Sequence, residues 1–94
     1  MGYNRRMRLL IVYQPDSEHA RTVQEFVHEF THVHPDTKVE LMDAASVEAE
    51  DLAKVYDIVE YPTSLVLAED GTMQNMWSGP TMPLMNEVLG YLNV

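Results

Sequence analysis

Cysteine is absent from this chain of 94 residues. Its absence excludes disulfide bonds, thiol catalysis and every metal site that uses thiolate ligands. Positive charge is also scarce, because six Lys and Arg residues stand against fifteen Asp and Glu, and the formal net charge is −9. Such a surface repels a phosphate backbone, so we expect no nucleic-acid partner.

Long hydrophobic runs are missing as well. The apolar segment from Leu9 to Tyr13 is too short for a signal-peptide core or a membrane span, so we expect no membrane partner and a cytoplasmic location. Arg5, Arg6 and Arg8 precede it, and we interpret residues 1–8 as a solvated basic flank rather than an anion-binding or membrane-surface arm. The length and the apolar content of 46% are typical of one compact domain, which we assign to residues 9–94.

Hydrophobic patterning predicts a strand and a helix in the first third of the chain. The continuous apolar run at 9–13 is typical of a strand buried on both faces. Pro15 and Asp16 end it, and Ser17 or Asp16 is expected to cap a helix that begins at Glu18 and closes before Pro35. Five apolar residues recur at spacings of three and four and are expected to share the buried face of this helix: Val23, Phe26, Val27, Phe30 and Val33.

The rest of the chain predicts a strand, a helix, a hairpin and a final helix. Residues 38–43 alternate as a half-buried strand does, and Ser46 caps a short helix that ends near Tyr56. Strands at 63–68 and 72–77 are joined by Asp70-Gly71, which is expected to supply the positive φ angles of a tight hairpin. The last helix is expected to open at Thr81, with Pro83 in its first turn. Three of its residues are expected to share a face: Leu84, Val88 and Tyr91.

This β-α-β-α-β-β-α order, together with the residues at its corners, resembles the thioredoxin superfamily in its shorter form. The most specific segment is LAKVYDIVEYPT at 52–63, which is similar to the family's helix, short connection and Pro-Thr before the third strand. The later Asp70-Gly71 turn, the Trp-Ser-Gly sequence at 77–79 and the amphipathic last helix are also similar. The resemblance implies an α/β fold with a central mixed four-stranded sheet flanked by helices, and a cis peptide bond before Pro62.

The first helix departs from the family's pattern. Ser17 and Ala20 occupy the positions where redox-active relatives have two cysteines separated by two residues, and Ile11 sits where many relatives have a buried carboxylate. Dithiol chemistry needs a thiolate and a second thiol one turn later, so this chain cannot perform it. Two histories stay open: natural loss of redox function, which leaves a binding module, or a thiol-disulfide oxidoreductase whose cysteines have been replaced by Ser and Ala.

The resemblance also implies a surface that receives peptides. In this sequence it comprises the redox positions Ser17 and Ala20 together with five candidate binding residues: Glu18, His19, Tyr61, Pro62 and Gly79. The backbone of Tyr61 is expected to pair with an extended peptide as a short added strand. The alternative is a relic corner kept for folding. We therefore expect a redox-inactive interaction or assembly module that binds a protein or peptide and uses no cofactor.

One motif suggests metal chemistry. Residues 28–32 match the H-E-x-x-H pattern, in which two His one turn apart bind zinc and the Glu acts as general base. On the predicted helix, His28 and His32 lie opposite the apolar face and so face solvent, and His34 lies past the helix end. We interpret the match as coincidental and expect no metal site.

A second pattern combines the residue types of a hydrolytic triad in Asp16, Ser17 and His19. Side chains two positions apart on a helix point in different directions. We therefore expect no hydrolytic site in this turn.

Overall fold

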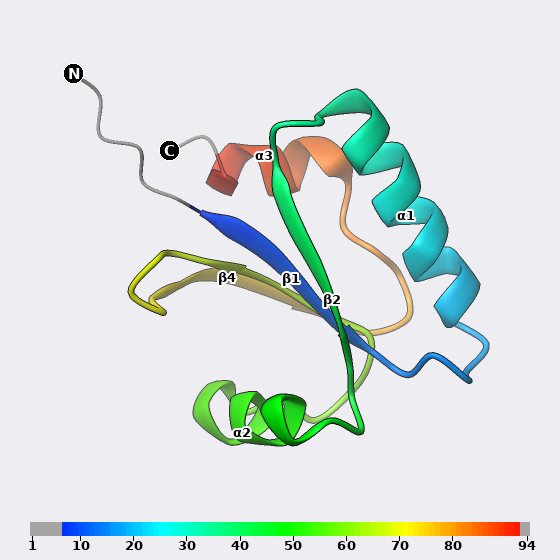
Figure 1. Ribbon diagram of the computed structural model, residues 1–94, viewed down its shortest axis with the longest axis vertical. Helices are drawn as coiled ribbons and strands as arrows, with labels where there is room; N and C mark the ends of the chain where they lie inside the picture. The colour runs from blue at the N-terminus through cyan, green and yellow to red at the C-terminus, as the bar shows by residue number, and fades with distance from the viewer. Residues whose placement is uncertain (1–6, 93–94) are drawn as a thin grey trace.

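Seven elements follow one another in the expected order in the computed structural model, which describes residues 7–92 (Figure 1). They are β1 (Arg8–Tyr13), α1 (Ala20–Val33), β2 (Lys38–Asp43), α2 (Val47–Tyr56), β3 (Thr63–Leu67), β4 (Met73–Ser78) and α3 (Met85–Leu92). The strands form one sheet in the order β2-β1-β3-β4. β1 runs parallel to β2 and antiparallel to β3, and β3 pairs antiparallel with β4. The expected mixed four-stranded sheet is confirmed.

β1 supplies both cores of the molecule, because successive side chains of a strand point to opposite faces of the sheet. Leu9 and Ile11 lie in the core that α1 and α3 cover, where Phe30 is also fully buried. Leu10 and Val12 lie in the second core, which α2 covers. Figure 1 shows α1 and α3 on one side of the sheet and α2 on the other. The apolar run of β1 is thus explained by burial on both faces.

α1 begins later than the sequence predicts. It starts at Ala20, its N-cap is His19, and no side chain caps it. Neither Ser17 nor Asp16 acts as the cap, because the chain first makes two successive turns in which the Ser17 amide donates to the Gln14 carbonyl and the Ala20 amide donates to the Ser17 carbonyl. The helix axis therefore begins three residues beyond Ser17.

The apolar face of α1 is also narrower than predicted. Val23 and Phe30 are buried, but Val33 is 49% exposed, which corrects its assignment to the buried face. At 3.6 residues per turn, Val33 lies about 60° around the helix from Phe30, and it is the last helical residue. The core ends at Phe30, and Val33 projects beyond it.

The hairpin between β3 and β4 uses a different turn from the one predicted. Only Gly71 has a positive φ, of 90°, and Asp70 does not share it. The Gly71 amide donates to the Ala68 carbonyl at 3.0 Å, and the Ala68 amide donates to the Thr72 carbonyl at 2.8 Å. This pattern is typical of a three-residue loop that ends in a left-handed residue, for which one glycine suffices.

α3 starts at Met85 rather than at Thr81, so Pro83 precedes the helix and is buried. The Leu84 carbonyl accepts from the Glu87 and Val88 amides, and the Leu84 amide donates to Glu87 Oε1 at 3.1 Å. This arrangement sets the helix start. It leaves Leu84 65% exposed, so the expected shared face reduces to Val88, with Tyr91 packed edge-on against Trp77.

The N-terminal boundary of the fold lies before the predicted one. Met7 is buried in the α1-side core and Arg8 is the first residue of β1, although both were assigned to the basic flank. Residues 1–6, with Arg5 and Arg6, and residues 93–94 lie outside the described part of the chain. Among the described residues no helix is long and apolar enough to cross a bilayer. The cytoplasmic location stays a prediction.

Candidate functional site

Three loops meet at the end of the sheet where β1 finishes. An open surface depression of about 490 Å³ is lined by Ser17, Glu18, His19 and Thr22, together with Pro80 from the loop after β4. The Gly79 amide donates to the Pro62 carbonyl at 3.1 Å, which joins that loop to the corner before β3. The structure therefore brings together the three segments that contain the predicted site residues.

The predicted residues differ in how much surface they offer. Glu18 is exposed, and Ser17, His19 and Tyr61 are half-buried, so all four are open to a ligand. Three others are buried and form the support of the site: Ala20, Pro62 and Gly79. Of the two positions that correspond to the redox cysteines, position 17 thus lies at the surface and position 20 lies beneath it.

The turn at 14–19 is held by hydrogen bonds to the backbone of Gln14. The Gln14 amide donates to His19 Nε2 at 3.1 Å, and the Gln14 carbonyl accepts from the Ser17 amide at 3.0 Å and from Ser17 Oγ at 2.6 Å. In this contact Nε2 of His19 acts as the acceptor. The hydroxyl proton of Ser17 points to a carbonyl rather than to His19. This geometry contains no activated serine.

The corner before β3 is supported by a buried threonine. Thr63 is fully buried, and its hydroxyl donates to the Glu60 carbonyl at 2.6 Å and lies 3.0 Å from Ser78 Oγ. A buried hydroxyl is costly unless it is paired, and these contacts pair it. The Tyr61–Pro62 bond between these residues is cis, as predicted. Ile11, at the position of the buried carboxylate of many relatives, is an ordinary fully buried core residue.

Sequence reasoning missed two residues of the depression, Thr22 and Pro80. Each lies next to a predicted feature in sequence: Pro80 follows Gly79, and Thr22 lies in the first turn of α1. Nothing in the residue types singles them out. Only the observation that three loops meet would have found them, and that observation requires the tertiary structure.

The H-E-x-x-H match lies on solvent-facing helix surface. His28 and His32 are exposed, as predicted, and the ring of His34 packs against Phe30 with its centroid 5.4 Å away. Within residues 7–92, no three His, Cys, Asp or Glu side chains are grouped so that they could hold a metal ion. The structure thus gives no support to a zinc centre on α1.

We expect thermal melts recorded with zinc and with a chelator to superimpose. A specific site, saturated a hundredfold above its dissociation constant, would stabilise the protein by about 2.7 kcal/mol. Differential scanning calorimetry measures the difference, and the His32→Ala variant serves as the control. An increase of several degrees in Tm that disappears in His32→Ala would contradict the absence of a site.

Comparisons with known proteins bear on the fold. No family model matches the sequence, and no curated protein is similar to it in sequence. Solved structures are similar in shape. An uncharacterised thioredoxin-like protein from Clostridium perfringens superposes with a TM-score of 0.76 at 15% identity, over 98% of this chain and 72% of its own.

Two thioredoxin structures are also similar. Fasciola hepatica thioredoxin has a TM-score of 0.70 at 16% identity, over 96% of this chain and 81% of its own. A chain in the crystal structure of the ferredoxin:thioredoxin reductase and thioredoxin f2 complex has a TM-score of 0.71 at 16% identity, over 96% of this chain and 77% of its own. The agreement in shape, the order of the elements and the absence of cysteine lead to one conclusion. The chain has a thioredoxin-like fold that lacks the cysteine pair.

Proposed function

We infer that this domain is a redox-inactive binding module, which receives an extended segment of a protein or peptide where its three loops meet. The observation that carries the proposal is the depression between the turn at 17–19 and Pro80, which the Gly79–Pro62 hydrogen bond links to the corner that contains the half-buried Tyr61. No residue there supplies a thiolate or an activated hydroxyl, so binding is the role that the site supports.

The backbone of Tyr61 supports pairing with an added strand. Among the described residues, no hydrogen bond engages its amide or its carbonyl, although the residue lies next to the end of β3. An extended segment that bonds to these groups gains affinity from main-chain contacts, and the neighbouring depression then receives a side chain. The similarity in shape to a chain from a complex of two proteins is consistent with this role.

Charge favours a basic segment as the ligand. Glu18 lines the depression, and Glu60 Oε1 lies near Gly79, 3.9 Å from where a Cβ would stand. The whole chain has a net charge of −9. Complementary charge speeds encounter and disfavours acidic partners, so we expect Lys or Arg in the bound segment.

Selection from a displayed library of random peptides tests the proposal. We expect selected peptides to be rich in Lys and Arg. They should bind Tyr61→Ala several-fold more weakly, because the Tyr61 ring packs against the core on the α2 side and its loss loosens the corner whose backbone pairs with the peptide. Glu18→Lys should weaken the same peptides. Val59→Ala is the matched control, because Val59 is 84% exposed and lies two residues before Tyr61. Peptides that bind Tyr61→Ala and Glu18→Lys as tightly as they bind the unmodified chain would contradict the proposal.

A further inference from the structure

The two edges of the sheet differ in how they are protected. β4 forms one edge, and its pairing with β3 is interrupted by a register shift between Val66 and Leu67. β2 forms the other edge and pairs with β1 in continuous register over all six residues, without a proline. Bulges, prolines and charged side chains are among the devices that keep sheet edges from pairing with other chains, and of these β2 has only the charges of Lys38, Glu40 and Asp43. β2 has neither a bulge nor a proline, so its backbone is regular enough to pair, and its charges decide which strand it accepts.

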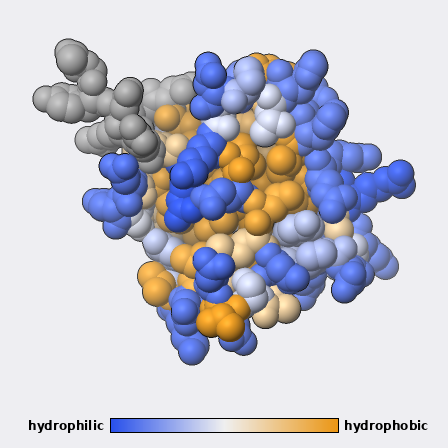
Figure 2. All heavy atoms as spheres, viewed as in Figure 1, coloured by the Kyte–Doolittle hydropathy of each residue, from blue (hydrophilic) through white to orange (hydrophobic). Residues whose placement is uncertain are grey.

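The β2 edge also exposes apolar surface. Leu41 is 40% exposed and Val39 is half-buried, although both belong to the sheet. β2 is the strand nearest the viewer in Figure 1, and the same view in Figure 2 shows an apolar area at the centre of this face, bordered by polar side chains. A regular strand with free backbone groups and apolar neighbours is suited to pairing with another strand.

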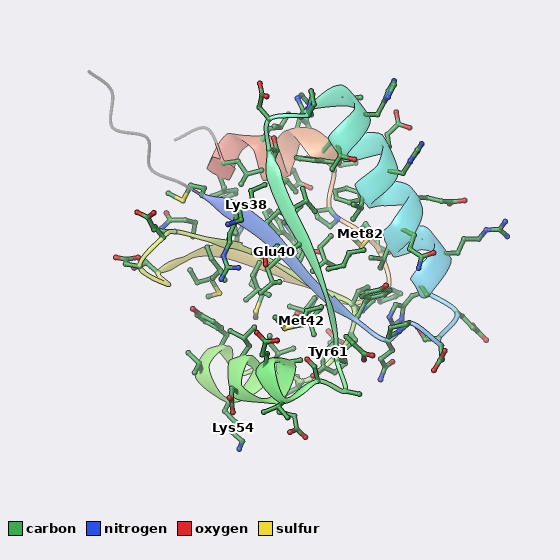
Figure 3. All side chains as sticks on the ribbon, viewed as in Figure 1. Lys38, Glu40, Met42, Lys54, Tyr61 and Met82 are labelled. Atoms are coloured by element: carbon green, nitrogen blue, oxygen red, sulfur yellow. The ribbon has the colours of Figure 1, made fainter. Side chains whose placement is uncertain are left out.

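The order of charges along β2 indicates which strand is suited to pair with it. Lys38 and Glu40 project from the same face of the sheet, as Figure 3 shows. Glu40 forms an ion pair with Arg8, whereas Lys38 has no ion pair with any described residue. A positive and a negative residue two positions apart can satisfy each other across two copies of one strand.

Only one antiparallel register uses this complementarity. With a two-fold axis at Glu40, the two Glu40 carboxylates face each other, which is destabilising. With the axis at Leu41, Glu40 faces Met42 and no charge meets its opposite. With the axis at Val39, Lys38 of each copy lies opposite Glu40 of the other. The charges therefore select the third register.

We propose that two copies of this chain associate through their β2 strands, antiparallel about an axis at Val39. Two Lys38–Glu40 pairs and a central pair of Val39 side chains then join two sheets into one of eight strands. Because β1 and β2 are parallel, with Arg8 beside Lys38 and Tyr13 beside Asp43, this contact lies at the opposite end from the turn at 14–19. The dimer leaves the depression open, and its existence does not depend on the function of that depression.

Sedimentation velocity over a concentration series tests the dimer. The net charge of −9 on each copy opposes association. Measurement at physiological ionic strength, where the Debye length is about 8 Å, screens this long-range repulsion and leaves the close pairs largely intact. We expect concentration-dependent dimers of the unmodified chain. A chain that stays monomeric up to millimolar concentration would overturn the proposal.

Charge reversal tests the register. Lys38→Glu places two carboxylates opposite each other and Glu40→Lys places two ammonium groups opposite each other, so each variant alone should dimerise roughly tenfold more weakly. An equimolar mixture of the two restores opposite charges at both pairs, so it should form heterodimers with the affinity of the unmodified chain. If the mixture dimerises no more tightly than each variant does alone, the proposed register is wrong.

Matched controls carry the same changes of charge on α2. Lys54→Glu repeats the change of Lys38→Glu, and Glu48→Lys repeats that of Glu40→Lys, at exposed positions away from β2 (Figure 3 labels Lys54). Both should dimerise as the unmodified chain does. Melting curves identify any loss of stability from breaking the Arg8–Glu40 pair. If the controls weaken association as much as the β2 variants, net charge and not strand pairing governs it, and the proposal fails.

Discussion

Phe30→Ala is expected to lower the free energy of unfolding by about 3–5 kcal/mol, the usual cost of emptying a buried aromatic site. Phe30 is fully buried in the core between the sheet and α1. Its ring stacks on Phe26 at a centroid distance of 5.7 Å and contacts His34 at 5.4 Å, so truncation removes both contacts and leaves a cavity. Urea denaturation followed by tryptophan fluorescence measures the loss.

Val33→Ala is the matched control on the same helix. Val33 lies three residues further along α1 and is 49% exposed, so its truncation should change the unfolding free energy by no more than about 0.5 kcal/mol. Because small domains are stable by only about 5–15 kcal/mol, the Phe30 variant should be partly unfolded at room temperature in mild denaturant. Equal losses at the two positions would mean that the packed face of α1 is assigned incorrectly.

Gly79→Ala is expected to cost about 1–3 kcal/mol, through the backbone rather than through a clash. Gly79 has a φ of 112°, which residues with a Cβ rarely adopt. A Cβ there would meet Glu60 Oε1 at 3.9 Å, an ordinary contact distance. The substitution should therefore strain the loop that hydrogen-bonds to the Pro62 carbonyl and should weaken peptide binding as well as stability.

Gly90→Ala makes the same change of side chain but is expected to change the free energy of unfolding in the opposite direction. Gly90 lies on the exposed side of α3, and a Cβ there would meet nothing within 4 Å. Alanine should raise the unfolding free energy by about 0.5–1 kcal/mol, because it restricts the unfolded chain and favours the helix. Thermal melts of both variants, measured side by side, check the pair. A stabilised Gly79→Ala protein would contradict the described loop.

Elements whose local signals agree with their packing were predictable from the sequence. β2 begins and ends where alternation predicts, and Ser46 Oγ accepts from the Ala49 amide as a helix cap should. The start of α1 was not predictable in this way. Ser17 has the residue type of a cap, but its hydroxyl bonds back to Gln14, and this local competition is decided by the geometry of the chain leaving β1.

Part of the candidate site could be indicated from the sequence, but its assembly could not. Resemblance to a family indicated Ser17, His19 and Tyr61 individually, because each lies at a recognisable corner of the sequence. That Pro80 faces the turn across a depression depends on how β4 pairs with β3, which places Ser78 opposite Thr63. Side-chain hydrogen bonds such as that of His19 to the Gln14 amide depend on rotamers that no pattern of residue types encodes.

The hydrogen bond from Ser17 Oγ to the Gln14 carbonyl limits how this turn can change over evolution. A thiol is a weak donor, so a cysteine at position 17 would give up that bond and leave Gln14 held by one amide and by His19. A chain that acquired a cysteine at position 17 would lose rigidity in the turn before it gained any reactivity. Serine at this position thus contributes a hydrogen bond to the order of the turn, and a change to cysteine costs that order whatever chemistry it adds.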